Sequence, residues 1–107
     1  MKYQVHITED ADQDLRGIYR YIARNDSKSK AKKLFGKIEE TCLSLSSLPK
    51  RGHIPPELEK VAVFDYLEIH FKPYRIIYEI SSNKVYIHCI LDGRRELNQL
   101  LQKRLLR

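Results

Sequence analysis

The sequence predicts a single α+β domain over residues 1–107, in which a small antiparallel sheet packs against a helical hairpin and is followed by a C-terminal helix. Two stretches with helical spacing of apolar residues come first, strand-like alternation dominates the second half, and a leucine-rich segment ends the chain. The expected order is therefore β-α-α-β-β-β-α. A chain of this length buries roughly 60–70% of the surface that its unfolded form exposes, so no covalent or metal staple is required.

The first half begins with a short predicted strand over residues 2–7, where apolar and polar side chains alternate. Thr8 is the expected N-cap of a first helix, which runs to about Arg24 with acidic residues in its first turn. A short turn leads into a second helix that ends at Pro49, so the two form an αα-hairpin. The apolar stripe of the second helix comprises Ala31, Leu34, Ile38, Cys42, Leu45 and Leu48.

The second half supplies three consecutive strands and a final helix. Residues 49–59 are rich in Pro and Gly and predict a long loop, after which residues 61–71 return to strand character. Residues 74–91 predict a hairpin by their alternation, and we expect all helices to cover one face of the resulting sheet. The apolar hairpin positions are Tyr74, Ile76, Tyr78 and Ile80 on one strand and Val85, Ile87, Cys89 and Leu91 on the other, and the last helix contains Leu97, Leu100, Leu101 and Leu105.

Composition limits the classes of function. The net charge of +6 indicates an anionic partner, nucleic acid or an acidic protein, or else ordinary surface charge that keeps the protein soluble. No secretory segment and no run of 18 apolar residues is visible, so we expect a cytoplasmic protein with no membrane contact. Cys42 and Cys89 are expected to be buried core residues, with a disulfide left open. His53 has no companion at ligand spacing, so we expect no metal and no cofactor.

Several segments in this order and spacing resemble the RelE/ParE superfamily of bacterial toxins from type II toxin-antitoxin modules. They are ADQDLRGIYRYIARND on the first helix, LSSLPKRG at the helical exit, FKPYRIIYEI on a strand, ILDGRREL before the last helix, and the ending RLL. The resemblance covers nearly the whole chain. It implies a plasmid-stabilisation type of toxin that arrests growth and forms a hetero-oligomer with a cognate antitoxin, whose disordered segment folds on binding.

The resemblance implies two mechanisms. ParE-like members poison DNA gyrase and break no bond themselves, whereas RelE-like members cleave mRNA on the ribosome. Glu68 and Leu101 stand where the RelE-like pattern has a lysine and a tyrosine, so the sequence favours the ParE-like branch. A basic RNA- or protein-binding domain without toxicity is a further alternative.

Candidate site residues follow from both readings. If the chain is a nuclease, His70 is the expected base, and Arg75 and Arg95 are the cations that stabilise the charged transition state. Alternation also places Arg75 beside Glu68, so structural ion pairing is an equal alternative for this arginine. Expected contacts to the target or to nucleic acid are Lys72, Arg94, Arg95, Lys103 and Arg104.

Overall fold

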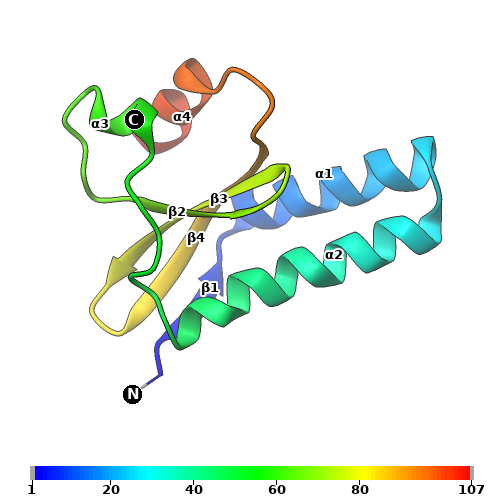
Figure 1. The fold of residues 1–107 in the computed structure, drawn as a ribbon, viewed down its shortest axis with the longest axis horizontal. Helices are drawn as coiled ribbons and strands as arrows, with labels where there is room; N and C mark the ends of the chain where they lie inside the picture. The colour runs from blue at the N-terminus through cyan, green and yellow to red at the C-terminus, as the bar shows by residue number, and fades with distance from the viewer. Residues whose placement is uncertain (1, 107) are drawn as a thin grey trace.

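A computed structural model describes residues 2–106 and confirms the predicted order of elements (Figure 1). Met1 and Arg107 lie outside the described residues. None of the helices in the described part of the chain has the length and apolar character needed to cross a membrane. The elements are β1 (Gln4–Ile7), α1 (Glu9–Asn25), α2 (Lys28–Leu43), the 3-10 turn η1 (Ser44–Ser46), α3 (Pro56–Glu59), β2 (Leu67–Phe71), β3 (Tyr74–Ser81), β4 (Lys84–Asp92) and α4 (Asn98–Leu105).

The four strands form one sheet in the order β1-β4-β3-β2. Strands β2, β3 and β4 make the predicted antiparallel meander. Strand β1 joins the free edge of β4 in parallel, with Val5 opposite Val85, so the sheet is mixed rather than wholly antiparallel. This pairing joins residues about eighty positions apart, which the alternation of either strand alone does not reveal.

A side-chain cap fixes the start of each helix in the helical hairpin. The Thr8 hydroxyl accepts a hydrogen bond from the Ala11 N–H at 3.2 Å and donates one to the Ile87 carbonyl at 2.9 Å. Ser27 caps α2 by accepting from the Lys30 N–H at 3.1 Å. Both caps satisfy N–H groups that a helix leaves unpaired at its start. The predicted N-cap at Thr8 is confirmed, and its second bond also ties α1 to the sheet.

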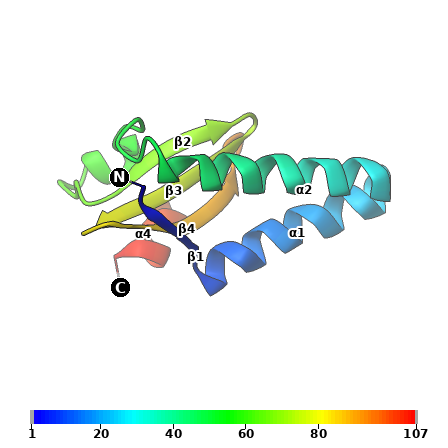
Figure 2. The ribbon, with the colours of Figure 1, turned by 90° about the horizontal axis from the view of Figure 1, so that it is seen from below.

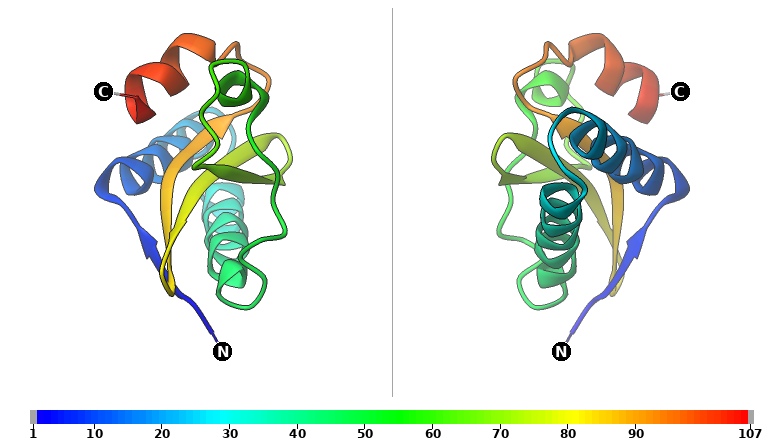
Figure 3. Two further views of the ribbon diagram at one scale, coloured as in Figure 1. Left: turned by 90° about the vertical axis from the view of Figure 1, so that its left-hand side faces the viewer. Right: turned by 90° about the vertical axis from the view of Figure 1, so that its right-hand side faces the viewer.

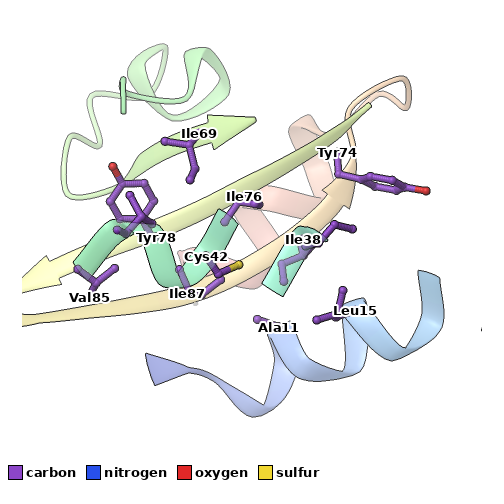
Figure 4. Packing of buried hydrophobic residues seen from close by; sticks show 12 residues of the cluster. Ala11, Leu15, Ile38, Cys42, Ile69, Tyr74, Ile76, Tyr78, Val85 and Ile87 are labelled. Atoms are coloured by element: carbon purple, nitrogen blue, oxygen red, sulfur yellow. The ribbon is translucent and has the colours of Figure 1, made fainter. Parts of the chain in front are cut away.

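The helical hairpin covers one face of the sheet and forms the larger core (Figure 4). Each buried Leu or Ile side chain contributes about 1.5–3 kcal/mol to folding. Burial also raises the pKa of the Cys42 thiol to about 12. The fully buried members shared between the hairpin and the sheet include Ala11, Leu15, Ile38, Cys42, Leu45, Ile76, Tyr78, Val85 and Ile87.

The opposite face of the sheet is covered by α3 and α4, so the expectation that all helices lie on one face is wrong (Figures 2 and 3). A register shift between Ile77 and Tyr78 leaves His88 as an extra residue on β4. A bulge of this kind reverses the alternation, so Cys89 packs toward α4 whereas Ile87 packs toward the hairpin. Cys42 and Cys89 are buried, as predicted, and both are free because they lie in separate cores.

The segment between α2 and β2 differs from the predicted loop and strand. Leu48 and Phe64 are exposed, α3 forms inside the expected loop, and β2 begins only at Leu67. The Tyr78 hydroxyl anchors this segment from the core, donating to the Pro49 carbonyl at 2.6 Å and accepting from the Gly52 N–H at 3.2 Å. Apolar composition predicted a strand from residue 61, but pairing with β3 begins only at Leu67, which lies opposite Tyr78.

Replacing Tyr78 by Phe tests the anchor. The variant leaves the Pro49 carbonyl and the Gly52 N–H without their partner, and one lost buried partner costs about 1–3 kcal/mol in the free energy of unfolding. Urea denaturation of Tyr78→Phe measures the loss. The matched control is Tyr21→Phe, whose ring is exposed and whose change should stay within about 0.5 kcal/mol. Equal stabilities of the two variants would show that the anchor contributes nothing.

Candidate functional site

Glu68 lies at the centre of the most connected polar cluster of the sheet. It is the second residue of β2, on the face covered by α3, and only 2% of its surface is exposed. A buried carboxylate must be paired, because an isolated buried charge is strongly unfavourable. Arg75 on the neighbouring strand supplies the pair, donating from Nε to Oε1 at 2.6 Å and from Nη2 to Oε2 at 3.2 Å.

Arg75 also holds a second carboxylate from a different element. Its Nη1 and Nη2 atoms each donate to an oxygen of Glu57 on α3, both at 2.7 Å. The side chain of Arg75 is 13% exposed, and all three of its nitrogens donate to protein carboxylates. The hydrogen bonds from Arg75 lower the pKa of Glu57, and those to Glu57 raise the pKa of Arg75. Of the two alternatives for Arg75, the structure therefore shows ion pairing.

Two histidines border the other side of the Glu68 carboxylate. His53 Nε2 lies 3.1 Å from Oε2, and His70 Nε2 lies 3.5 Å from Oε1. Their ring centroids are 5.4 Å apart and the ring planes meet at 82°. The sequence shows no ligand-spaced partner for His53, but the folded chain brings Glu68 and His70 next to it, so the expectation drawn from spacing is wrong. A backbone bridge between His53 and Glu68 brings these distant positions together. Lys72 and Arg94 line the same shallow groove.

The adjacent arginines form a cationic rim, which we define as Arg94 and Arg95. Arg94 is 72% exposed and pairs at 2.8 Å with Asp92, whose pKa its hydrogen bonds lower to about 2. Arg95 is exposed and lines a separate groove beside α1, together with Tyr21. The rim faces water, and so do Lys72 and Lys103. Their roles in binding a target stay predictions.

Arg104 differs from these exposed cations because it holds α4 against the domain. Its guanidinium donates to both Asp14 oxygens at 3.0 and 3.2 Å and to the His88 carbonyl at 2.8 Å. Asp14 in turn accepts the Ile90 N–H at 3.0 Å. The predicted target residue Arg104 therefore joins α4, α1 and β4, and its first role in this fold is structural.

The three proposed nuclease residues do not share one groove. His70 and Arg75 lie together, whereas Arg95 lines the groove beside α1. Leu101, at the position where the RelE-like pattern has a tyrosine, is fully buried in the second core. Sequence reasoning missed Glu57 and His53, because both come from an irregular segment without periodicity.

Comparison with known proteins identifies the fold. The profile described as the ParE toxin of the type II toxin-antitoxin system parDE matches residues 5–97. No match is found among curated proteins.

Two solved structures are similar. A chain of the chromosomal ParDE toxin-antitoxin system from P. aeruginosa superimposes with a TM-score of 0.72 and 19% identity, covering 85% of this chain and 96% of that one. A chain of the toxin-antitoxin complex RelBE2 from Mycobacterium tuberculosis gives a TM-score of 0.64 and 21% identity, covering 86% of this chain and 92% of that one. At these identities the two structures show the fold alone. The profile match extends over most of the chain, and the protein therefore belongs to the ParE toxin family, within the RelE/ParE superfamily.

Proposed function

We propose that this protein is a ParE-like toxin that arrests growth by poisoning DNA gyrase and has no nuclease activity of its own. The observation that carries the proposal is the double ion pair of Arg75. Cleavage of RNA through a charged transition state needs cations directed at the phosphate. The guanidinium of Arg75 is directed instead at Glu57 and Glu68, and those two carboxylates give the cluster an excess negative charge when its histidines are neutral.

The exposed cations then serve as a binding surface. The cationic rim together with Lys72 and Lys103 presents positive charge to solvent. Positive charge of this kind steers association with DNA or with an acidic protein surface. Gyrase bound to DNA offers both. The lysine-rich start of α2 adds Lys28, Lys30, Lys32, Lys33 and Lys37, all exposed.

A cognate antitoxin is the expected second partner, and we propose a hetero-oligomer in the cytoplasm. Both structural neighbours come from toxin-antitoxin systems. This chain leaves Leu43, Leu48 and Phe64 exposed, which gives a folding segment apolar surface to cover. A net charge of +6 favours an acidic partner.

The ribosome-dependent nuclease stays the second candidate because of one observation. His53 and His70 both lie at the Glu68 carboxylate, and imidazole is the side chain that most often serves as general acid or base. This candidate requires a cation other than Arg75 to stabilise the transition state. The third alternative is a non-toxic binding domain, which would leave both gyrase and mRNA unaffected.

Assays with purified protein separate these functions. We expect gyrase supercoiling to fall and cleaved DNA to accumulate, while mRNA on translating ribosomes stays intact. Cleaved mRNA with unimpaired gyrase would overturn the proposal in favour of the nuclease. Unimpaired gyrase together with intact mRNA would favour the non-toxic binding domain. Addition of the antitoxin encoded beside the gene is the control, and it should restore supercoiling.

Replacement of Arg75 by Ala distinguishes a structural from a catalytic arginine. Removing one partner of a buried ion pair costs about 3–5 kcal/mol, because Glu68 is left buried and uncompensated. Chemical denaturation should show this loss for Arg75→Ala and a change within about 0.5 kcal/mol for the exposed control Arg94→Ala. An Arg75→Ala variant of unchanged stability that has lost toxicity would instead assign Arg75 to the target.

Replacement of Arg95 by Ala tests the cationic rim. A lost hydrogen bond to a charged group costs about 1.5–3 kcal/mol, so the affinity for the target should fall about 10–100-fold and growth arrest should weaken. The melting temperature should stay nearly unchanged, because the side chain is exposed. Arg24→Ala, at an exposed arginine near the end of α1, is the matched control. Undiminished growth arrest by Arg95→Ala would exclude a role for this arginine.

A further inference from the structure

We infer that His53, Glu68 and His70 form a binding site for one divalent transition-metal ion of the zinc class. This inference does not depend on the proposed function, because it is tested by metal binding and not by growth arrest. Within residues 2–106, one ligand atom of each of the three residues lies within 4.8 Å of the other two. Two imidazoles and one carboxylate are a donor set that binds Zn²⁺ with an open coordination position.

The observed distances fit a small tetrahedral ion. Bonds of about 2.0–2.1 Å at a tetrahedral centre place neighbouring ligand atoms about 3.3 Å apart. His53 Nε2 lies 3.1 Å from Glu68 Oε2 and His70 Nε2 lies 3.5 Å from Oε1, so each imidazole is close to this spacing from a different oxygen of the carboxylate. The two rings lie edge to face, with planes at 82° and centroids 5.4 Å apart, so both imidazoles are close together beside the carboxylate.

The site is held in place before any ion binds. Glu68 is buried and oriented by Arg75, which takes the role that outer-shell partners play around metal ligands. Each carboxylate oxygen accepts more than one bond, so pairing with Arg75 leaves capacity for a metal. His53 is positioned by backbone hydrogen bonds in both directions with Glu68, at 3.1 and 2.7 Å.

Gly52 makes this close approach possible. A Cβ atom at Gly52 would lie 2.6 Å from the Glu68 carbonyl oxygen, which is closer than carbon and oxygen can pack. The loop therefore reaches β2 only with glycine at this position, and the next residue along the chain is His53. The spacing of His53 from β2 is thus fixed by backbone contact rather than by a flexible side chain.

The local charge also favours a cation. Arg75 faces two carboxylates, Glu57 and Glu68, so the ion-paired cluster has one negative charge more than it has positive charges when the histidines are neutral. His53 and His70 are 60% and 42% exposed, which gives an ion a direct path from solvent. Imidazole ligands select zinc-class ions over Mg²⁺ and Ca²⁺, which prefer all-oxygen sites. Lys72 and Arg94 in the same groove oppose binding and limit the affinity, although Arg94 is paired with Asp92.

Titration of the full-length, tag-free protein with Zn²⁺ tests the site, with isothermal calorimetry for stoichiometry and Co²⁺ absorption for coordination. We expect one ion per chain, visible Co²⁺ bands of a low-coordinate nitrogen and oxygen site, and a rise in melting temperature with Zn²⁺ but not with Mg²⁺. Either His53→Ala or His70→Ala should weaken Zn²⁺ binding by at least about tenfold. Both histidines are exposed, so the metal-free variants should keep the wild-type melting temperature.

The matched controls are the other two histidines. His6 stacks on Tyr86 and His88 bonds to Glu79, so His6→Ala and His88→Ala should retain the wild-type affinity. The inference is overturned if no Zn²⁺ binds more tightly than about 100 μM. It is equally overturned if the affinity survives in His53→Ala and His70→Ala, or falls as much in the two controls.

Discussion

The structure depends most on the ion pairs that Arg75 makes with Glu57 and Glu68. They join β3 to β2 and to α3, on a face of the sheet that apolar packing alone covers only in part. Burial of such charges costs several kcal/mol per ion unless each is paired. The network is complete, since among the described residues no buried side-chain nitrogen or oxygen lacks a hydrogen-bond partner. These ion pairs hold α3 against the sheet and orient the Glu68 carboxylate beside the two histidines.

The same network decides where positive charge is available. One basic residue of the sheet is neutralised inside the domain, whereas the cationic rim follows the last strand at the surface. In this domain the arginine that could have contacted a scissile phosphate, Arg75, is instead ion-paired with Glu57 and Glu68. This difference favours a toxin that acts by binding, and it separates the ParE-like proposal from the nuclease candidate more clearly than the number of basic residues does.

Both faces of the sheet are covered because β4 changes its alternation partway along. The extra residue His88 turns Cys89 toward α4 while Ile87 stays with the helical hairpin. Arg104 then fixes α4 through Asp14, which also binds the backbone of β4. The bulge directs Cys89 into the second core, and the ion pair of Arg104 with Asp14 holds α4 over that core. Arg104 is therefore no longer part of the expected binding surface.

The sequence by itself determined the order of elements, the N-cap of the first helix, the burial of both cysteines and the family resemblance, because these depend on local periodicity and on short motifs. Tertiary structure decided the parallel pairing of β1, the second helical layer, the partners of Arg75 and the meeting of His53 with Glu68. Those features join residues from distant or irregular segments. Their contacts form because buried backbone groups and buried charges must find partners in the folded domain. The periodicity of a single segment does not show which distant residue that partner is.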